Sequence, residues 1–436
     1  MASRRADQAR HRLSGLAAGL LAAVSSTAGA VQIDYTIDAG VQQDDNVTLS
    51  PDDPIEQRFL RAGIGFGVRQ DSSAFQLSLD GRAEYRNYRD DVFSDTLDGT
   101  MTGRLNWVAI PSRLHFTAED SLTVQPVDAL VPNAPGNRQQ VNVFSAGPTM
   151  LFQWSQTVSG QADLRYIDSR AEVTEEFNSR RYELSLRGIR QLDPTSRFSL
   201  NSQFQDVDFD EEASPDYRRV NAYARYARTL TRFDLGIDAG YSWIHYRDST
   251  REDPLLRVNL GWRPTQRSEF TLAAINQFSD TATDALTGIP PNATVPEFVP
   301  VGDTVINASA FRTRRLALDY IYTGTRLQFQ IGPYVETRRY IDADMYDEDV
   351  EGGRFDLSWR LQPRTTVGLL GGYDAHDYRV LGRKDEVLRA SAYAQRDFSR
   401  HWSARLEWVR YERTSSLASQ DVTQNTLYLS VIYSNR

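Results

Sequence analysis

The stretch that decides the fold is Ser73–Tyr88, SAFQLSLDGRAEYRNY. From Phe75 to Tyr85, every second residue is apolar or small, while the residues between them, and Arg86 after them, are polar or charged. Successive side chains of a strand point to opposite faces, so the pattern predicts a strand with one apolar and one hydrated face. The alternation is longer than the usual soluble strand of about five or six residues. It matches the roughly nine to eleven residues with which a strand crosses a bilayer.

The same two-faced pattern recurs along the chain, from Val31–Gln42 to a last segment with Leu427 and Tyr433 on one face. The 436 residues are 40 % hydrophobic and 25 % charged, and the mean hydropathy is −0.51. Beyond the N-terminus, no stretch approaches the ~18–20 consecutive apolar residues of a membrane helix. A membrane β-barrel has such a composition because half of each strand faces water.

The polar connections between these segments alternate between long and short. The long ones fall near 43–57, 88–94, 126–139, 169–178, 208–216, 247–253, 279–303, 341–352, 378–384 and 413–422. The short ones fall near 70–72, 110–112, 155–156, 192–196, 230–231, 264–267, 323–324, 362–364 and 398–401. Outer-membrane barrels have long extracellular loops and short periplasmic turns. The least clear region is 303–322, where Leu316–Tyr322 indicates a strand and Asp303–Arg312 fits a loop.

We therefore predict an all-β fold, a transmembrane antiparallel up-and-down β-barrel with long extracellular loops and short periplasmic turns. Counting the segments gives about 20 strands, within a range of roughly 18–22, and puts both termini on the short-turn side. The predicted location is the outer membrane of a Gram-negative bacterium, with membrane lipid and lipopolysaccharide around the barrel.

The N-terminus is typical of a cleaved signal peptide. Arginines between Arg4 and Arg12 precede the apolar stretch Leu13–Val24, and Ala28-Gly29-Ala30 forms a small-residue cleavage site. We expect residues 1–30 to be removed and residues 31–436 to form a single barrel domain. The formal net charge of the whole chain is −9, and removing this Arg-rich segment makes it more acidic. An acidic chain of this kind is a poor candidate for binding nucleic acid.

The tryptophans are expected to form an aromatic girdle. Five of the seven fall at the short-turn ends of predicted strands: Trp107, Trp154, Trp262, Trp359 and Trp402. Trp243 and Trp408 lie toward the other end. Amphipathic aromatic side chains collect at membrane–water boundaries. The simpler alternative is that large aromatics only fill strand positions, but it does not predict clustering at one end.

If the apolar faces contact lipid, the opposite faces line the lumen with interleaved charges of both signs. The candidate lumen-lining residues are Asp80, Arg82, Glu84, Arg86, Arg104, Arg165, Arg187, Arg257, Arg263, Arg354, Asp356, Arg360 and Arg405. A barrel of this size encloses more space than side chains fill, so we expect a water channel or a plugged lumen. The charges either brace the wall as ion pairs or bind a sliding polyol or acidic sugar through bidentate contacts.

Two loops suggest further roles. Ser279–Asp303 is the longest connection and is a candidate constriction or lid over the pore, with a mobile outer loop as the alternative. The acidic loop Asp342–Glu351 either binds calcium or bridges lipopolysaccharide, or is simply solvated.

Signals for catalysis are weak. The histidines are scattered, there is no Cys, and no H-E-x-x-H, G-x-S-x-G or EF-hand motif occurs. His245 near Asp248 is the one pairing of interest, and such a pair at a strand end commonly arises by chance. We therefore expect no enzyme, no cofactor and no metal site.

One segment carries a family resemblance. Gln139–Pro148, QQVNVFSAGP, resembles a recurrent strand of outer-membrane β-barrels found with extracellular-polysaccharide biosynthesis and exosortase-associated (PEP-CTERM) gene clusters. The insertion at 279–303 and the Arg/Tyr-rich return Arg312–Tyr340 are similar in style. The resemblance implies an export pore or accessory barrel for exopolysaccharide, and it transfers no catalytic residue.

Three functions follow as hypotheses. The first is a channel that exports polysaccharide or assists its export, with polysaccharide as cargo and periplasmic export proteins as partners. The second is a general diffusion porin for small solutes. The third is a structural or adhesive barrel with a blocked lumen.

Overall fold

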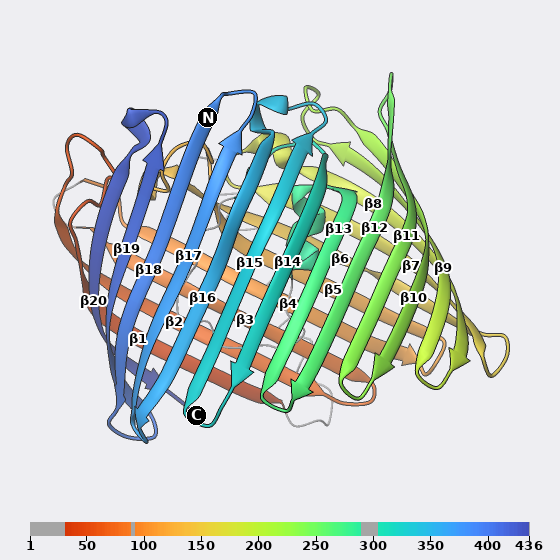
Figure 1. Ribbon diagram of the computed structural model, residues 1–436, viewed down its shortest axis with the longest axis horizontal. Helices are drawn as coiled ribbons and strands as arrows, with labels where there is room; N and C mark the ends of the chain where they lie inside the picture. Colours follow the sequence, from red (N-terminus) through yellow and green to blue (C-terminus); the bar gives the residue numbers. More distant parts are fainter. Residues whose placement is uncertain (1–30, 89–91, 289–303, 436) are drawn as a thin grey trace.

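The computed structural model describes residues 31–88, 92–288 and 304–435, and these form one closed antiparallel sheet of twenty strands (Figure 1). Each strand pairs with the next along the chain, and β1 (Gln32–Asp44) pairs with β20 (Val422–Ser434), which closes the barrel. The predicted fold class and strand number are confirmed. The predicted signal peptide, residues 1–30, lies outside the described residues.

The remaining strands have 12 to 16 residues each. They are β2 Gln57–Asp71, β3 Phe75–Asn87, β4 Thr96–Ile110, β5 Leu114–Pro126, β6 Arg138–Gln153, β7 Val158–Ala171, β8 Ser179–Asp193, β9 Ser196–Phe209, β10 Tyr217–Leu230, β11 Phe233–His245, β12 Thr250–Thr265, β13 Ser268–Ser279, β14 Phe311–Thr323, β15 Leu327–Tyr340, β16 Glu348–Gln362, β17 Thr365–Tyr378, β18 Arg383–Asp397 and β19 Trp402–Ser415. These lengths are sufficient for tilted strands to cross a bilayer.

Across the described residues, helical structure is confined to the connections. The helices are α2 Thr281–Thr287 and the single 3-10 turns η2 Pro135–Asn137, η3 Glu175–Phe177, η4 Asp344–Tyr346 and η5 Ala418–Gln420. Among the residues that the structure describes, no helix has the length and apolar character needed to span a membrane.

The predicted alternation of loops is confirmed for most connections. Connections of two to four residues, such as 72–74 and 363–364, join strands at one end of the barrel, and most loops at the other end have six residues or more. Two predicted long loops are shorter than expected, because strand pairing continues into them and leaves only the four-residue connections 246–249 and 379–382. The C-terminus lies at the end with the short turns, which we call the turn end (Figure 1). The opposite end is the loop end. In the least clear region, residues 304–310 are irregular as expected, but strand β14 (Phe311–Thr323) begins earlier than predicted and includes Phe311 and Arg312.

The two faces of each strand differ in burial as the alternation predicts. On β1, Ile33 and Ile37 point outward and are 56 % and 48 % exposed, whereas Asp34 and Asp38 point inward and are buried. The outer wall carries the apolar side chains, and the inner wall carries the charges. Tyr85 on β3 follows this rule and is exposed on the outer face.

Leu77 and Leu79 lie on the same outward face of β3 as Tyr85 but are buried. They pack against side chains of the neighbouring strands, including Phe66 of β2 and Met101 of β4. Side chains of the neighbouring strands on the outer wall therefore shield Leu77 and Leu79 from lipid. Alternation predicts which face a residue occupies, but not how far its neighbours cover it.

Candidate functional site

A polar cavity of about 1390 Å³ lies inside the barrel. The cavity wall is formed by β1–β3 and by strands β14–β20. At the turn end it includes Arg400 and Trp402, and toward the loop end it reaches Glu348 and His376. The cavity therefore runs along one side of the lumen for much of its height.

Glu84 on β3 is the centre of one ion-pair network on this wall. Its side chain is fully buried and accepts from Arg61 at 2.5 Å and from Arg86 at 2.6 Å. Arg82, two residues away on the same face, is 2.7 Å from Asp38 of β1. Four strands are thereby connected, because Arg86 also reaches Asp98 of β4 at 2.9 Å.

Gly63 of β2 makes this network possible. It pairs with Asp38 on one side and with Glu84 on the other, so its Cα faces the centre of the network. A Cβ at this position would lie 2.1 Å from Nη2 of Arg82. The Arg82–Asp38 bridge therefore needs a residue without a side chain between them.

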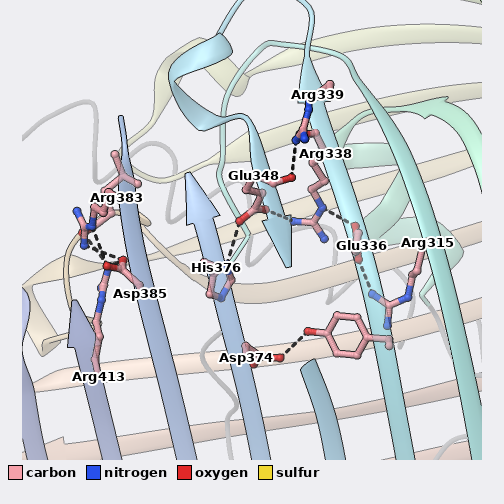
Figure 2. Close-up of polar contacts among 12 residues, drawn as sticks. Arg315, Glu336, Arg338, Arg339, Glu348, Asp374, His376, Arg383, Asp385 and Arg413 are labelled. Atoms are coloured by element: carbon pink, nitrogen blue, oxygen red, sulfur yellow. Dashed lines mark hydrogen bonds and ion pairs between the residues drawn. The ribbon is translucent and has the colours of Figure 1, made fainter. Parts of the chain in front are cut away.

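A second network braces β14–β17 (Figure 2). Glu336 accepts from Arg315 at 2.5 Å and from Arg338 at 2.6 Å. Arg338 also reaches Glu348 at 3.3 Å, and Glu348 lies 3.0 Å from Nδ1 of His376. Charges of alternating sign on neighbouring strands thus satisfy one another along the inner wall.

Tyrosines lie among these charges. The Tyr334 hydroxyl donates to Asp374 at 2.6 Å, and the Arg315 guanidinium lies 4.1 Å from the centre of the same ring. Arg405 lies 3.9 Å from the Tyr393 ring centre in the same way. The wall therefore presents flat aromatic and guanidinium surfaces as well as hydrogen-bonding groups.

The structure brings five of the sequence-predicted lumen residues to this cavity: Arg82, Arg86, Arg354, Asp356 and Arg405. Glu84 is fully buried and does not line the cavity itself. The other predicted residues are engaged elsewhere: Asp80 with Thr102, Arg104 with Glu119, Arg165 with Asp163, Arg187 with Asn201, Arg257 with Asp238, and Arg263 with Asp234. Arg360 is exposed beside a short turn, outside the cavity lining.

Other cavity residues were missed by the sequence analysis, notably Asp38, Arg338, Glu348 and His376. Asp38 falls on the polar face of the alternating stretch Val31–Gln42, so strand periodicity was sufficient to find it. The other three sit near strand ends, where the chain leaves the wall and the pattern is short.

The long connection after β13 enters the barrel. Asp280, the first residue after β13, is buried and forms ion pairs with Arg181 of β8 and with Arg219 of β10, the latter at 3.2 Å. Its carboxylate also accepts from the backbone N–H of Thr283 at 3.0 Å and caps α2. These partners hold the pKa of Asp280 well below its usual range, against the opposing effect of burial.

Helix α2 then packs against an apolar part of the inner wall. Val141 and Val143 of β6 point inward and are buried by Ala282 of α2 and Ile306. Strand alternation places apolar side chains on the lipid face, and these two valines are exceptions. Nothing in a strand pattern distinguishes a face covered by lipid from one covered by a returning loop.

A second long loop crosses the loop end. The carbonyl oxygen of Leu130, between β5 and β6, accepts from Arg383 of β18 at 2.6 Å and from Arg413 of β19 at 2.9 Å. Both arginines also contact Asp385, as Figure 2 shows. Loops from β5 and β13 therefore both contact distant walls, and the described parts of these loops occupy the lumen at its loop end. Residues 289–303 of the candidate lid lie outside the described residues.

Asp284 on α2 makes the anchoring of this helix dependent on pH. Burial, opposed by a hydrogen bond from Ser279, raises the pKa of Asp284 to about 6. A carboxyl with a raised pKa stabilises the packed state at pH below its ordinary value, near 4, and loses this contribution as pH rises through about 6. We expect limited proteolysis next to α2 to become faster between pH 4 and pH 7. Asp284→Asn should remove this dependence, and an unchanged pH profile in that variant would contradict the assignment.

The five predicted girdle tryptophans all lie at the turn end. Trp107, Trp154, Trp262, Trp359 and Trp402 are 49–66 % exposed. Trp107 stacks on Phe116 and Trp262 on Phe270. Toward the loop end, Trp243 donates to Glu252 at 3.2 Å. Half-exposed aromatics in a belt, beneath an exposed apolar wall, are the arrangement that suits a lipid boundary.

A closed barrel with its apolar side outward and its charges inward fits a lipid environment and not water. The chain is an outer-membrane β-barrel. Its long loops are then extracellular and its short turns periplasmic.

Residues of the acidic loop and the isolated histidine are engaged in local contacts. Asp349 is held by Arg339 and Arg379, each at 2.5 Å, so its charge is already compensated. His245 contacts Thr250 at 3.0 Å. In the ranges 31–88, 92–288 and 304–435, no group of three or more His, Cys, Asp or Glu residues is arranged to hold a metal ion.

No family model matches the chain, and no curated protein matches it. Two solved structures, of a ferric enterobactin receptor and an iron transporter, show a weak similarity. A mutant of the ferric enterobactin receptor PfeA from Pseudomonas aeruginosa has a TM-score of 0.48 and 10 % identity over 92 % of this chain and 80 % of that one. For the FrpB iron transporter from Neisseria meningitidis, the TM-score is 0.44 and the identity 8 %, over 92 % and 81 % of the chains. Similarity this low says nothing of cargo.

Proposed function

We propose that the protein is an outer-membrane channel that exports extracellular polysaccharide or assists its export. The observation that carries the proposal is the polar cavity along β1–β3 and β14–β20. Its volume of about 1390 Å³ exceeds the ~300–1,000 Å³ typical of pockets for single small molecules. It extends from Glu348 near the loop end of the wall to Arg364 and Arg400 at the turn end.

The chemistry of the wall supports a carbohydrate cargo. Guanidinium groups, carboxylates and tyrosine hydroxyls can exchange hydrogen bonds with a polyol. The partly exposed ring of Tyr334 lies in the same wall and offers a flat surface for a sugar face. The family resemblance of Gln139–Pro148 points to the same class of cargo. Partners of this activity would be periplasmic export proteins at the turn end and lipopolysaccharide around the loop end.

A barrel with a blocked lumen is the second candidate, and one observation favours it. Asp280 and Leu130 anchor two loops to distant walls at the loop end. If these contacts are permanent, the barrel serves as a scaffold whose loops contact the matrix. If they open, they form a gate.

Planar-bilayer recordings test the proposal. We expect the purified protein to conduct, with current that a soluble polysaccharide blocks from the periplasmic side in a length-dependent way. A general porin would pass small sugars without block by polymer. A barrel with no current, even when residues 289–303 are deleted, would rule out the channel and favour the scaffold.

A further inference from the structure

The cavity is richer in positive charge than the rest of the chain. Ten arginines and eight carboxylates line it, although the whole chain has a formal net charge of −9. The excess of acidic residues therefore lies outside the cavity. An enclosed wall with this bias concentrates anions, because low-dielectric surroundings focus its field.

The carboxylates of the cavity already have partners. Asp38 is bound by Arg82, Glu336 by two arginines, and Glu407 by Arg405 and Ser391. The others are engaged as well: Asp34, Glu348, Asp356, Asp374 and Asp397. Each carboxylate of the cavity therefore already interacts with another residue of the protein.

Three arginines of the same cavity differ. Within the described residues, the guanidinium groups of Arg354, Arg364 and Arg400 form no ion pair or hydrogen bond with another residue. Arg364 and Arg400 lie in the short turns 363–364 and 398–401, at the turn end of the cavity. Arg354 lies further in, near the middle of β16.

Arg354 also has space around it. On the adjacent strands, its direct neighbours are Gly332 of β15 and Gly372 of β17. A Cβ placed on Gly372 would meet no atom within 4 Å. On the β15 side, the carboxylate of Asp319 of β14 fills the space over Gly332. The wall beside Arg354 is therefore low only toward β17, where the exposed Arg354 side chain borders the cavity.

We propose that Arg354, together with Arg364 and Arg400 nearer the periplasmic opening, forms a track for oxyanions. The cargo is then an acidic glycan, whose carboxylate or phosphate groups pair in turn with these guanidinium forks. This inference rests on the proposed function and specifies its substrate class. Asp38, Glu336 and Glu407 on the same wall are each paired with an arginine, which reduces their repulsion of such a cargo.

Titration calorimetry of the detergent-solubilised protein tests the track with three probes: trigalacturonate, glucose 1-phosphate and neutral maltotriose. We expect trigalacturonate to bind, and to bind more weakly as salt is raised. Arg354→Gln should weaken that binding by about tenfold or more, the loss expected for a charge-assisted hydrogen bond. Glucose 1-phosphate tells whether phosphate is accepted as well as carboxylate. Arg113→Gln, in an exposed turn outside the cavity, is the matched control and should bind as the unmodified protein does.

Equal binding of trigalacturonate and maltotriose would overturn the inference, as would unchanged affinity in a folded Arg354→Gln protein. The outcomes remain separable from those of the bilayer recordings. Conduction blocked equally by neutral and acidic polymers leaves the channel standing and rejects the anion track. Binding of trigalacturonate without any conduction keeps the track and rejects the channel.

Discussion

Replacing Asp280 with alanine is expected to release α2 from the barrel wall and to increase the conductance of the channel. The substitution leaves Arg181 and Arg219 buried without a counter-ion and removes the cap of α2. Removing one partner of a buried ion pair costs about 3–5 kcal/mol. Such a change shifts the ratio of attached to released loop by a factor on the order of 10²–10³ or more.

The measurement is single-channel conductance together with protease sensitivity of the α2 segment. Asp248→Ala, in an exposed loop, is the control and should alter neither. Asp280→Asn keeps the size of the side chain and part of the cap, so it should fall between the two. If Asp280→Ala conducts like the unmodified protein while its loop becomes protease-sensitive, the loop is not the barrier to ions.

Replacing Glu84 with alanine is expected to give the largest loss of barrel stability. Glu84 is fully buried and is the shared partner of Arg61, Arg82 and Arg86. Its removal takes away the carboxylate that Arg61 contacts and leaves Arg82 and Arg86, within the described part of the chain, with only Asp38 and Asp98 as counter-ions. We expect a cost of about 3–5 kcal/mol or more in the free energy of unfolding.

Urea unfolding in detergent, followed by the mobility difference between folded and heated protein on a gel, measures this loss. Glu119→Ala is the control, because Glu119 forms an ion pair with Arg104 at 2.8 Å with both side chains about a third exposed or more. Such a pair contributes about 0–1 kcal/mol. Similar unfolding midpoints for the two variants would show that the network around Glu84 is not a major source of stability.

Strand periodicity was sufficient to predict most of the fold. Because side chains alternate strictly, a stretch such as Phe75–Arg86 fixes its own faces without reference to the rest of the chain. Turn length fixed the topology for a similar reason, since only short turns join adjacent antiparallel strands at one end. Both signals are local, and local signals are available from a single sequence.

The contents of the lumen were not predictable in the same way. Asp280 belongs to a loop without periodicity, and its partners Arg181 and Arg219 lie 99 and 61 residues away along the chain. The inward positions of Val141 and Val143 depend on the same loop, which replaces lipid as their apolar neighbour. Among the predicted arginines, alternation could not separate Arg354, which faces the cavity, from Arg104, which is paired elsewhere.

The contact between Leu130 and Arg413 has a consequence for biogenesis. The two residues are 283 positions apart, and Arg413 lies on the penultimate strand. This bond forms only when the last hairpins have joined the first ones, so it reports completed closure of the cylinder. In an insertion intermediate halted before β18, the carbonyl of Leu130 would lack its two arginine donors. The segment around Leu130 would then be open to proteases at the cell surface. The moment at which this segment becomes protected from proteases would therefore mark the final step of assembly.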